Sequence, residues 1–365
     1  MRCSLLVSSH KNQLATILHI NYNEYMTKKT VVVASGIVAI GTLVASILAI
    51  VRQDSGDALT QGSLPKNERL GVWDWTAPDT ISSSKKREIA AALKARGVTE
   101  VYIDITSYID DDELPDASVR TAKTSAFTTA LRETVRDLHS EGIAAHALAG
   151  GTHWADPDHA YIPLKLLAYV ADYNKTAMSD EKLAGMQFDI EFYNDKGFKE
   201  APLAYTQQFL DLTQSLVDER GKRFTDDPLF DLGFAISAAM DGSDTNYIPN
   251  INYNGTKQPP LSVLFHQLQG GNLPAYVAVM AYRNTAGATV ERVQTEMEMA
   301  KKVPNIKVLI GEETTNVAPK SLTFYGRPLA DLRQMTSSVQ STFADNPALG
   351  GYAINDQEGF LKLKD

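Results

Sequence analysis

Two carboxylates, Asp189 and Glu191, stand one residue apart at the end of a short apolar segment. Side chains alternate between the two faces of a strand, so both carboxylates point the same way. Two acids this close in a pocket cannot both ionise freely, and the pKa of one rises toward that of a general acid. Acids also form ion pairs or cap helices where strands meet loops. We favour catalysis for this pair because it ends the fourth of the predicted strands.

Polar and aromatic side chains end most of the other apolar segments. Those expected to line a site with the pair are Trp73, Asp74, Trp75, Asp104, Tyr282, Arg283, Glu312, Glu313, Asn355 and Asp356. Glu313 or its neighbour Glu312 could supply a second carboxylate across the site from Glu191. Where two carboxylates act on one carbon, a separation of about 5–5.5 Å indicates retention by double displacement, and one of about 6.5–9.5 Å indicates inversion through a water.

Tyr282 and Arg283 are expected to stabilise charge on the nucleophile or the substrate. Arg283 would do so through a bidentate carboxylate contact. A structural ion pair of Arg283 with Glu313 or Asp189 explains the residue equally well. Both readings remain open at the level of the sequence.

The three tryptophans of the chain are candidate platforms on which an apolar face of a ligand could pack. Trp73 and Trp75 flank Asp74, and we expect only one of the two to point into the site while the other joins the core. Trp154 is a second candidate platform.

The loop at residues 153–159 carries four side chains of types that bind metals, His153, Asp156, Asp158 and His159. Their spacing matches no recognised metal motif. A proline-containing turn between a strand and a helix explains them as well. We therefore predict no metal and no cofactor.

Eight short apolar segments alternate with longer amphipathic ones from residue 70 to the end. Nearly continuous apolar runs are typical of parallel strands that are buried on both faces. The predicted strands are residues 70–75, 98–105, 142–150, 184–192, 231–239, 275–282, 306–312 and 350–356. Between them, apolar residues recur at three- and four-residue spacing, which is typical of amphipathic helices.

This alternation fits a closed parallel barrel or a doubly wound sheet. Eight regular units, with no glycine fingerprint after the first strand, favour a (β/α)8 TIM barrel over residues 70–365. The active site of such a barrel lies at the C-terminal ends of the strands, where the candidate residues fall. We expect residues 240–260 to form a wall of the cleft and residues 357–365 to be a stub in place of an eighth helix.

The sequence GMQFDIE at residues 185–191 is similar to the strand-four signature of family 18 glycoside hydrolases, the chitinase group, whose pattern is D-G-x-D-x-D-x-E. Gly185, Asp189 and Glu191 match it, and Gln187 replaces an aspartate. The resemblance implies that Glu191 is the proton donor and that Asp189 orients a substrate acetamido group acting as the nucleophile. It also implies that Tyr282, in a Met-x-Tyr motif, hydrogen-bonds that group.

Other residues resemble the clan of retaining barrel glycosidases, whose acid/base lies on strand four and whose nucleophilic glutamate lies on strand seven. Glu313 or Glu312 stands there, although the Asn-Glu pair of that clan is absent. The chain also looks like an uncharacterised group of related barrels. These resemblances imply a glycoside hydrolase acting on a glycan. The alternatives are a non-catalytic glycan-binding barrel and a membrane-tethered partner of polysaccharide synthesis or export.

The composition of the 365-residue chain is that of a globular protein, with 44% hydrophobic and 22% charged residues. A net charge of −9 argues against nucleic acid as a partner, because phosphates need cationic side chains. The single cysteine, Cys3, excludes an intramolecular disulfide and a cysteine-based zinc site.

The N-terminal region predicts a membrane segment. Residues 30–50 are apolar and uncharged, long enough to span a bilayer, and follow Lys28 and Lys29. Positive charge before the apolar run favours a cytoplasmic N-terminus. This predicts a single-pass protein with an extracytoplasmic body, or a secreted protein if the segment is a cleaved signal peptide. Met26 is an alternative start that would make residues 1–25 an extension. The predicted organisation is a tail at residues 1–29, an anchor or signal at 30–52, a linker at 53–69 and a barrel domain at 70–365.

Overall fold

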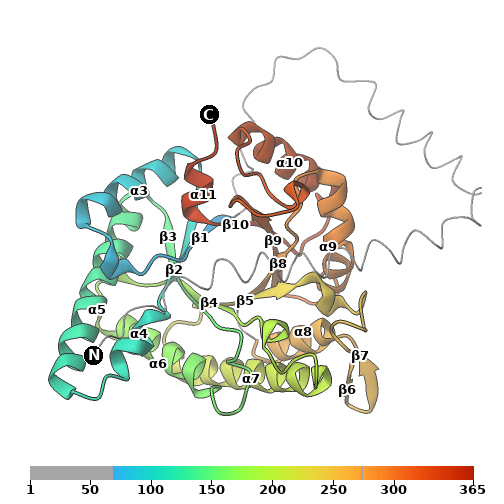
Figure 1. Cartoon of the computed structure of the whole chain (residues 1–365), viewed down its shortest axis with the longest axis horizontal. Coiled ribbons are helices and arrows are strands. Elements are labelled where there is room, and N and C mark those ends of the chain that lie inside the picture. Colours follow the sequence, from blue (N-terminus) through green and yellow to red (C-terminus); the bar gives the residue numbers. More distant parts are fainter. Residues whose placement is uncertain (1–68, 273) are drawn as a thin grey trace, which may run out of the picture.

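The computed structural model describes residues 69–272 and 274–365 of the chain. Its eight parallel strands form a closed barrel in the order β1-β10-β9-β8-β5-β4-β3-β2, which confirms the predicted TIM barrel. The first strand lies beside the last and closes the ring (Figure 1). The strands are β1 (Arg69–Asp74), β2 (Glu100–Asp104), β3 (Ala144–Gly150), β4 (Gly185–Asp189), β5 (Asp231–Ser237), β8 (Ala275–Met280), β9 (Ile306–Glu313) and β10 (Leu349–Asn355).

Helices surround the barrel because each amphipathic segment lays its apolar face on the strands (Figure 1). They are α3 (Ser83–Ala95), α4 (Ser107–Asp112), α5 (Ala117–Ser140), α6 (Tyr161–Thr176), α7 (Pro202–Arg223), α8 (Pro260–Gly270), α9 (Ala286–Ala300), α10 (Leu329–Thr342) and α11 (Gln357–Leu361). The 3-10 helices are η2 (Pro78–Thr80), η3 (Ser179–Glu181), η4 (Phe192–Asn194), η5 (Ala238–Asp241) and η6 (Lys320–Leu322). The short α11 takes the place of an eighth helix and packs on β1 and β10.

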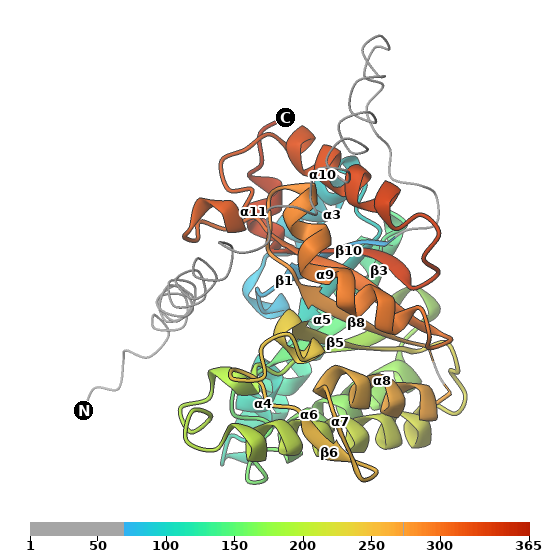
Figure 2. The ribbon, with the colours of Figure 1, turned by 90° about the vertical axis from the view of Figure 1, so that its right-hand side faces the viewer.

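The long segment after β5 folds into η5 and a small antiparallel hairpin, β6 (Ile251–Tyr253) with β7 (Thr256–Gln258). Asn254 and Gly255 form its two-residue turn, both with positive φ, as a tight hairpin requires. Figure 2 shows this hairpin beside α7 and α8, on the outside of the helical layer. The segment thus extends from the strand end at Ser237 to the flank of the molecule.

The barrel interior has a core of its own, separate from the one between strands and helices. Its members are Trp73, Tyr102, Leu148, Ala235, Tyr276, Ala278, Leu309 and Ala353. Tyr102 and Tyr276 lie across the interior, with their ring centroids 6.2 Å apart. Gly71 and Gly233 make this possible, because a Cβ at either position would lie within 2.4 Å of the nearer tyrosine ring. The filled interior is a packed core and leaves no pore.

Below these rings, at the N-terminal end of the barrel, lies a buried ionic cluster. The guanidinium of Arg69 pairs with Asp231 and, at 3.2 Å, with Glu100. The hydroxyl of Tyr102 donates to Glu100 at 2.8 Å. His146 lies 3.8 Å from Glu100, and burial lowers its pKa to about 4, so its ring is neutral at pH 7. The cluster links four strands and holds two carboxylates against one cation.

Within the part of the chain that the structure describes, no helix is long and apolar enough to cross a membrane. The predicted membrane segment, residues 30–52, lies outside the described residues, as do the tail at 1–29 and nearly all of the linker at 53–69.

Candidate functional site

Asp189 ends β4 on the interior face of the barrel, at the mouth formed by the C-terminal strand ends. A Cβ added at Gly150, on the neighbouring β3, would lie 3.3 Å from the Cβ of Asp189 and 3.4 Å from the ring of Trp75. These three residues therefore meet at the mouth, and the glycine leaves room for the two side chains.

We expect Gly150→Ala to disturb this contact, because its Cβ would lie 2.9 Å from the carbonyl oxygen of Asp189. One strand end must shift, at a cost of about 1–3 kcal/mol in the free energy of unfolding. Chemical denaturation measures the change. The matched control is Gly287→Ala in α9, where an added Cβ meets nothing within 4 Å. Equal stability of the two variants would refute the close contact.

Glu191 lies just beyond β4, where the chain turns into η4. The hydroxyl of Tyr193 donates to one carboxylate oxygen at 2.9 Å, and the side-chain amide of Asn194 donates to the other at 3.1 Å. The ring of Tyr247, from the segment after β5, lies 6.0 Å from that of Tyr193. This segment therefore forms one side of the site, where a wall was predicted.

The two acids of β4 differ in how their charges are stabilised. Burial raises the pKa of Asp189 well above its ordinary value, and the charge of Glu191 raises it further. The Oδ1 atom of Asp189 is buried with no hydrogen-bond partner in the described structure. Burial also raises the pKa of Glu191, but the hydrogen bonds from Tyr193 and Asn194 oppose the rise. The surroundings of Asp189 therefore favour its neutral form, whereas Glu191 has donors that stabilise its charge.

Glu313 ends β9 on the same interior face as Leu309. Its carboxylate accepts from the backbone N–H of Thr315 at 2.6 Å and from the side-chain amide of Asn355 at 2.8 Å. Burial raises the pKa of Glu313, and these donors oppose the rise. The other end of the Asn355 amide accepts from the indole N–H of Trp75 at 3.1 Å. Asn355 thus connects an aromatic ring at the mouth to this carboxylate.

Glu312 points the other way, into the layer between β9 and α9. It is 0% exposed and accepts from the backbone N–H of Arg283 at 2.9 Å and the hydroxyl of Thr289 at 3.1 Å. Burial raises its pKa to about 8, so it is mostly protonated at pH 7. Of the two predicted glutamates, Glu313 is the one at the mouth, because neighbours in a strand face opposite sides.

Tyr282, which follows β8, is close enough to the acids of β4 and β9 for their charges to act on its hydroxyl. It has positive φ, at 47°, and packs on the interior core. Burial raises the pKa of its hydroxyl well above the ordinary value, and the charges of Glu313, Asp189 and Glu191 raise it further. The phenol is therefore a neutral hydrogen-bond donor. Arg283 directs its guanidinium to the backbone carbonyls of Tyr282, at 2.8 Å, and Ala281.

Only Trp75 among the tryptophans has an accessible face. It is 38% exposed, whereas Trp73 is 2% and Trp154 is 3% exposed. Trp73 and Trp75 point to the same side of β1, but Trp73 lies one layer deeper and donates its indole N–H to Gln187. Trp154 packs against Gly151, where an added Cβ would lie 2.6 Å from its indole nitrogen. Neither buried ring is placed to stack on a sugar.

The remaining candidate acids are engaged in turns next to the strand ends. Asp74 and Asp104 accept backbone N–H groups two residues ahead, at 3.1 Å and 2.8 Å, and burial raises the pKa of each to about 6. Asp356 caps α11 by accepting from the N–H of Gly359 at 2.8 Å. These contacts fix the loops around the mouth.

The loop at residues 153–159 does not assemble a metal site. The rings of His153 and His159 meet edge to face at 4.7 Å, and Asp156 accepts from the N–H of Asp158. Among the described residues, no group of three or more histidine, cysteine, aspartate or glutamate side chains is arranged to hold a metal ion.

Sequence reasoning missed three residues around Glu191. Tyr193 and Asn194 follow it directly, and their types could have indicated donors folding back in a tight turn. Tyr247 lies 56 positions further on, and the sequence gives no signal that joins it to Glu191.

Comparisons with known proteins show where this fold also occurs. No protein-family model and no curated protein sequence matches the chain. An endo-1,4-beta-mannanase from Rhizomucor miehei is similar with a TM-score of 0.50 and 10% identity, over 83% of this chain and 89% of that one. A family 1 β-glucosidase from Thermotoga maritima has a TM-score of 0.50 and 10% identity, over 80% and 88%. A GH18 chitinase from Pseudoalteromonas aurantia has a TM-score of 0.49 and 15% identity, over 80% and 97%. At 10% identity the likeness to the mannanase and the β-glucosidase shows the fold alone, a TIM barrel.

Proposed function

We propose that the chain is a glycoside hydrolase in which Glu191 is the general acid/base and Glu313 is the opposing carboxylate. One observation carries the proposal. Acids from the ends of β4 and β9 lie around the accessible ring of Trp75: Asp189 and Trp75 meet at Gly150, and Asn355 joins Trp75 to Glu313 through hydrogen bonds. Paired carboxylates of unequal proton affinity, with an aromatic face next to them, are the machinery that glycoside hydrolysis needs.

In the proposed reaction Glu191 gives its proton to the glycosidic oxygen as the bond from that oxygen to the anomeric carbon breaks. The carboxylate of Glu313 forms a bond to the anomeric carbon from the opposite face, which gives a covalent ester. A water then loses a proton to Glu191 and attacks the same carbon, which releases Glu313. The two inversions give net retention.

Asp189 and Tyr282 support these steps. Burial of the two neighbouring acids disfavours ionisation of both at once, so a proton is held at the pair for Glu191 to donate. The Tyr282 hydroxyl donates a hydrogen bond to the charge that develops between β4 and β9. A substrate with an acetamido group would place its carbonyl where Asp189 and Tyr282 can reach it.

The test is a screen of the full chain on neutral oligosaccharides, with the anomer of each product followed by NMR. Initial formation of the retained anomer supports double displacement through Glu313, and the inverted anomer refutes it. If the chain binds oligosaccharides but hydrolyses none, it is a glycan-binding barrel instead.

The pH profile of kcat/KM provides a prediction about Asn355. Its amide donates to the Glu313 carboxylate and so favours the ionised form. In Asn355→Ala we expect the pKa of Glu313 to rise, so the acidic limb of the profile moves to higher pH. The control is Trp75→Phe, which removes the indole donor to Asn355 and leaves the Glu313 contact. An acidic limb unmoved in Asn355→Ala would count against Glu313 as the ionised partner.

We also propose that residues 30–52 tether the barrel outside the membrane through the linker at residues 53–69. The support is the uncharged apolar run after Lys28 and Lys29. The N-terminal mass of the protein recovered from membranes tests it. Cleavage after residue 50 would indicate a secreted protein instead.

A further inference from the structure

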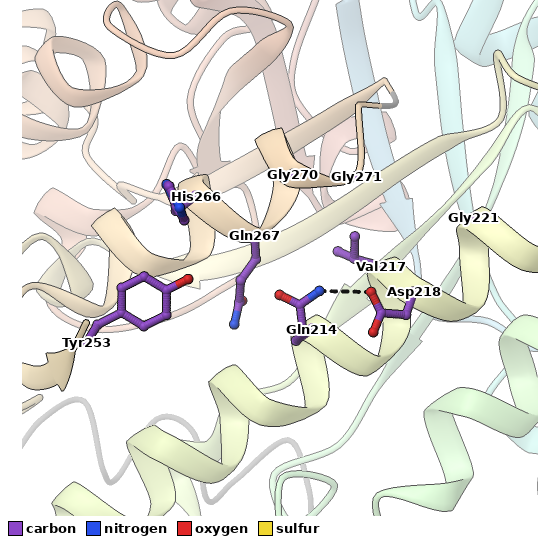
Figure 3. A pocket seen from close by; sticks show the side chains of 9 residues that line it. All are labelled: Gln214, Val217, Asp218, Gly221, Tyr253, His266, Gln267, Gly270 and Gly271. Carbon is purple, nitrogen blue, oxygen red and sulfur yellow. Dashed lines mark hydrogen bonds between the residues drawn. The ribbon is translucent and has the colours of Figure 1, made fainter. Parts of the chain in front are cut away.

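A groove lies on the flank of the barrel, between the second halves of α7 and α8 (Figure 3). Its volume is about 440 Å³, which is in the range of small-molecule sites. It is lined by Gln214, Val217, Asp218, Gly221, Tyr253, His266, Gln267, Gly270 and Gly271. None of the candidate catalytic residues of the mouth lines this groove, and no lining residue belongs to a barrel strand.

The lining residues restrict the chemistry of a ligand. They include no lysine or arginine, and Asp218 is acidic, so an anionic ligand is disfavoured. Val217 is the only aliphatic side chain among them, which disfavours a lipid or an apolar peptide. The amides, the carboxylate and the two rings that remain suit a neutral ligand with many hydroxyl groups.

Buried hydrogen bonds hold Gln267 in place, and an exposed hydrogen bond joins Gln214 to Asp218 on the surface of α7. The Gln267 side chain accepts from Thr213 at 2.7 Å and donates to the carbonyl of Leu210 at 2.9 Å. The amide of Gln214 donates to Asp218 at 2.9 Å, as Figure 3 shows. Side chains fixed in this way lose little freedom when they bind a ligand.

Two rings stand at one end of the groove. Tyr253 of the β6–β7 hairpin and His266 of α8 meet edge to face, with centroids 5.7 Å apart. Aromatic rings offer a flat surface to the C–H face of a sugar, while amides and carboxylates bind its hydroxyls. The contact between Tyr253 and His266 joins the β6–β7 hairpin to α8 and so accounts for the position of the hairpin outside the barrel.

Glycines keep the groove open. A Cβ added at Gly221 or Gly270 would meet nothing within 4 Å. Larger side chains at these two positions would therefore enter open space without strain in the fold. This provides a way to fill the groove without removing any of its contacts.

The groove is remote from the mouth. In this barrel each helix starts near the C-terminal end of one strand and returns the chain to the start of the next. The last turns of α7 and α8 therefore lie toward the end of the barrel opposite Asp189 and Glu191. A ligand in the groove does not contact the candidate catalytic residues.

We propose that this groove is an accessory binding site for a neutral oligosaccharide segment. It holds a polysaccharide on the flank while another part of the same or a neighbouring chain occupies the mouth. The inference takes its substrate class from the proposed function, but its binding chemistry belongs to different residues.

The experiment uses the full chain with the β-1,4-linked hexasaccharides of glucose, mannose and N-acetylglucosamine as probes. Titration calorimetry in the Glu191→Gln background counts the sites per chain. We expect two sites, of which Gly221→Trp removes one, and affinity at that site about tenfold lower in Tyr253→Ala and His266→Ala. The control is His139→Ala, which removes a histidine from the last turn of α5, outside the groove. The kcat on a short chromogenic glycoside should be the same in all groove variants and the wild type.

The outcomes separate this inference from the proposed function. A chain that hydrolyses a probe but binds one hexasaccharide, unaffected by Gly221→Trp, overturns the groove and leaves the glycosidase intact. A chain that hydrolyses none of the probes but loses binding in Gly221→Trp overturns the glycosidase and supports the groove. Binding equal in Gly221→Trp, Tyr253→Ala and the wild type overturns the groove in either case.

Discussion

Replacing Glu191 by glutamine is expected to lower kcat about 10²–10⁴-fold while oligosaccharide affinity stays nearly unchanged. The amide has the same shape as the acid and can still accept from Tyr193, but it cannot give a proton to a leaving group. A loss in kcat without a change in binding is the mark of an interaction made only in the transition state.

Steady-state kinetics and calorimetry on the same preparation measure both quantities. The matched control is Glu296→Gln in α9, another carboxyl-to-amide change at a buried position. Burial raises the pKa of Glu296 to about 8, so an amide replaces a group that is already mostly neutral at pH 7. We expect Glu296→Gln to keep wild-type kcat. Retained turnover in Glu191→Gln would remove this residue from the mechanism.

Replacing Arg69 by methionine should destabilise the fold by about 3–5 kcal/mol, because Asp231 and Glu100 lose their shared cation while staying buried. Burial raises the pKa of both acids, and Arg69 opposes the rise. Without Arg69 their folded-state pKa values rise further above the unfolded ones. An acid whose pKa is higher in the folded state than in the unfolded state loses its proton more readily when the protein unfolds. The free energy of unfolding of the variant should therefore decrease as pH increases above the unfolded pKa values, about 4.

Urea unfolding at several pH values measures this effect. Lys85→Met is the control, because it breaks an exposed pair with Glu88 on α3 that is worth about 0–1 kcal/mol. A second variant, Arg69→Met with Asp231→Asn and Glu100→Gln, removes the stranded charges and should recover part of the loss. Equal stability of Arg69→Met and Lys85→Met would show that the cluster contributes little.

The fold was predictable because its signal is repeated along the chain. Each strand is a short apolar run buried on both faces, and the count of eight distinguishes a closed barrel from an open sheet. The strand ends were less certain: the run at residues 184–192 was expected to be strand throughout, but β4 ends at Asp189. The Glu191 carboxylate depends on a turn, which apolar periodicity does not detect.

The site was predictable where it follows from strand alternation. Neighbouring residues of a strand face opposite sides, so only one of Glu312 and Glu313 could reach the mouth. Leu309 lies in the barrel interior in the structure, and Glu313 is on the same face of β9, so Glu313 is the residue at the mouth. The same rule places Trp73 and Trp75 on one side of β1. Trp73 is buried because it lies further inside the barrel, and Trp75 is accessible because it lies at the mouth. Contacts between distant segments, such as Tyr247 with Tyr193, have no such local signature.

The aromatic layer of Tyr102 and Tyr276 and the charges beneath it close the barrel axis at its lower end. If the proposed function is correct, a polysaccharide substrate cannot thread through the molecule and must lie across the rim. In the proposed reaction, substrate would then enter and products would leave through the same opening, the mouth at the C-terminal ends of the strands.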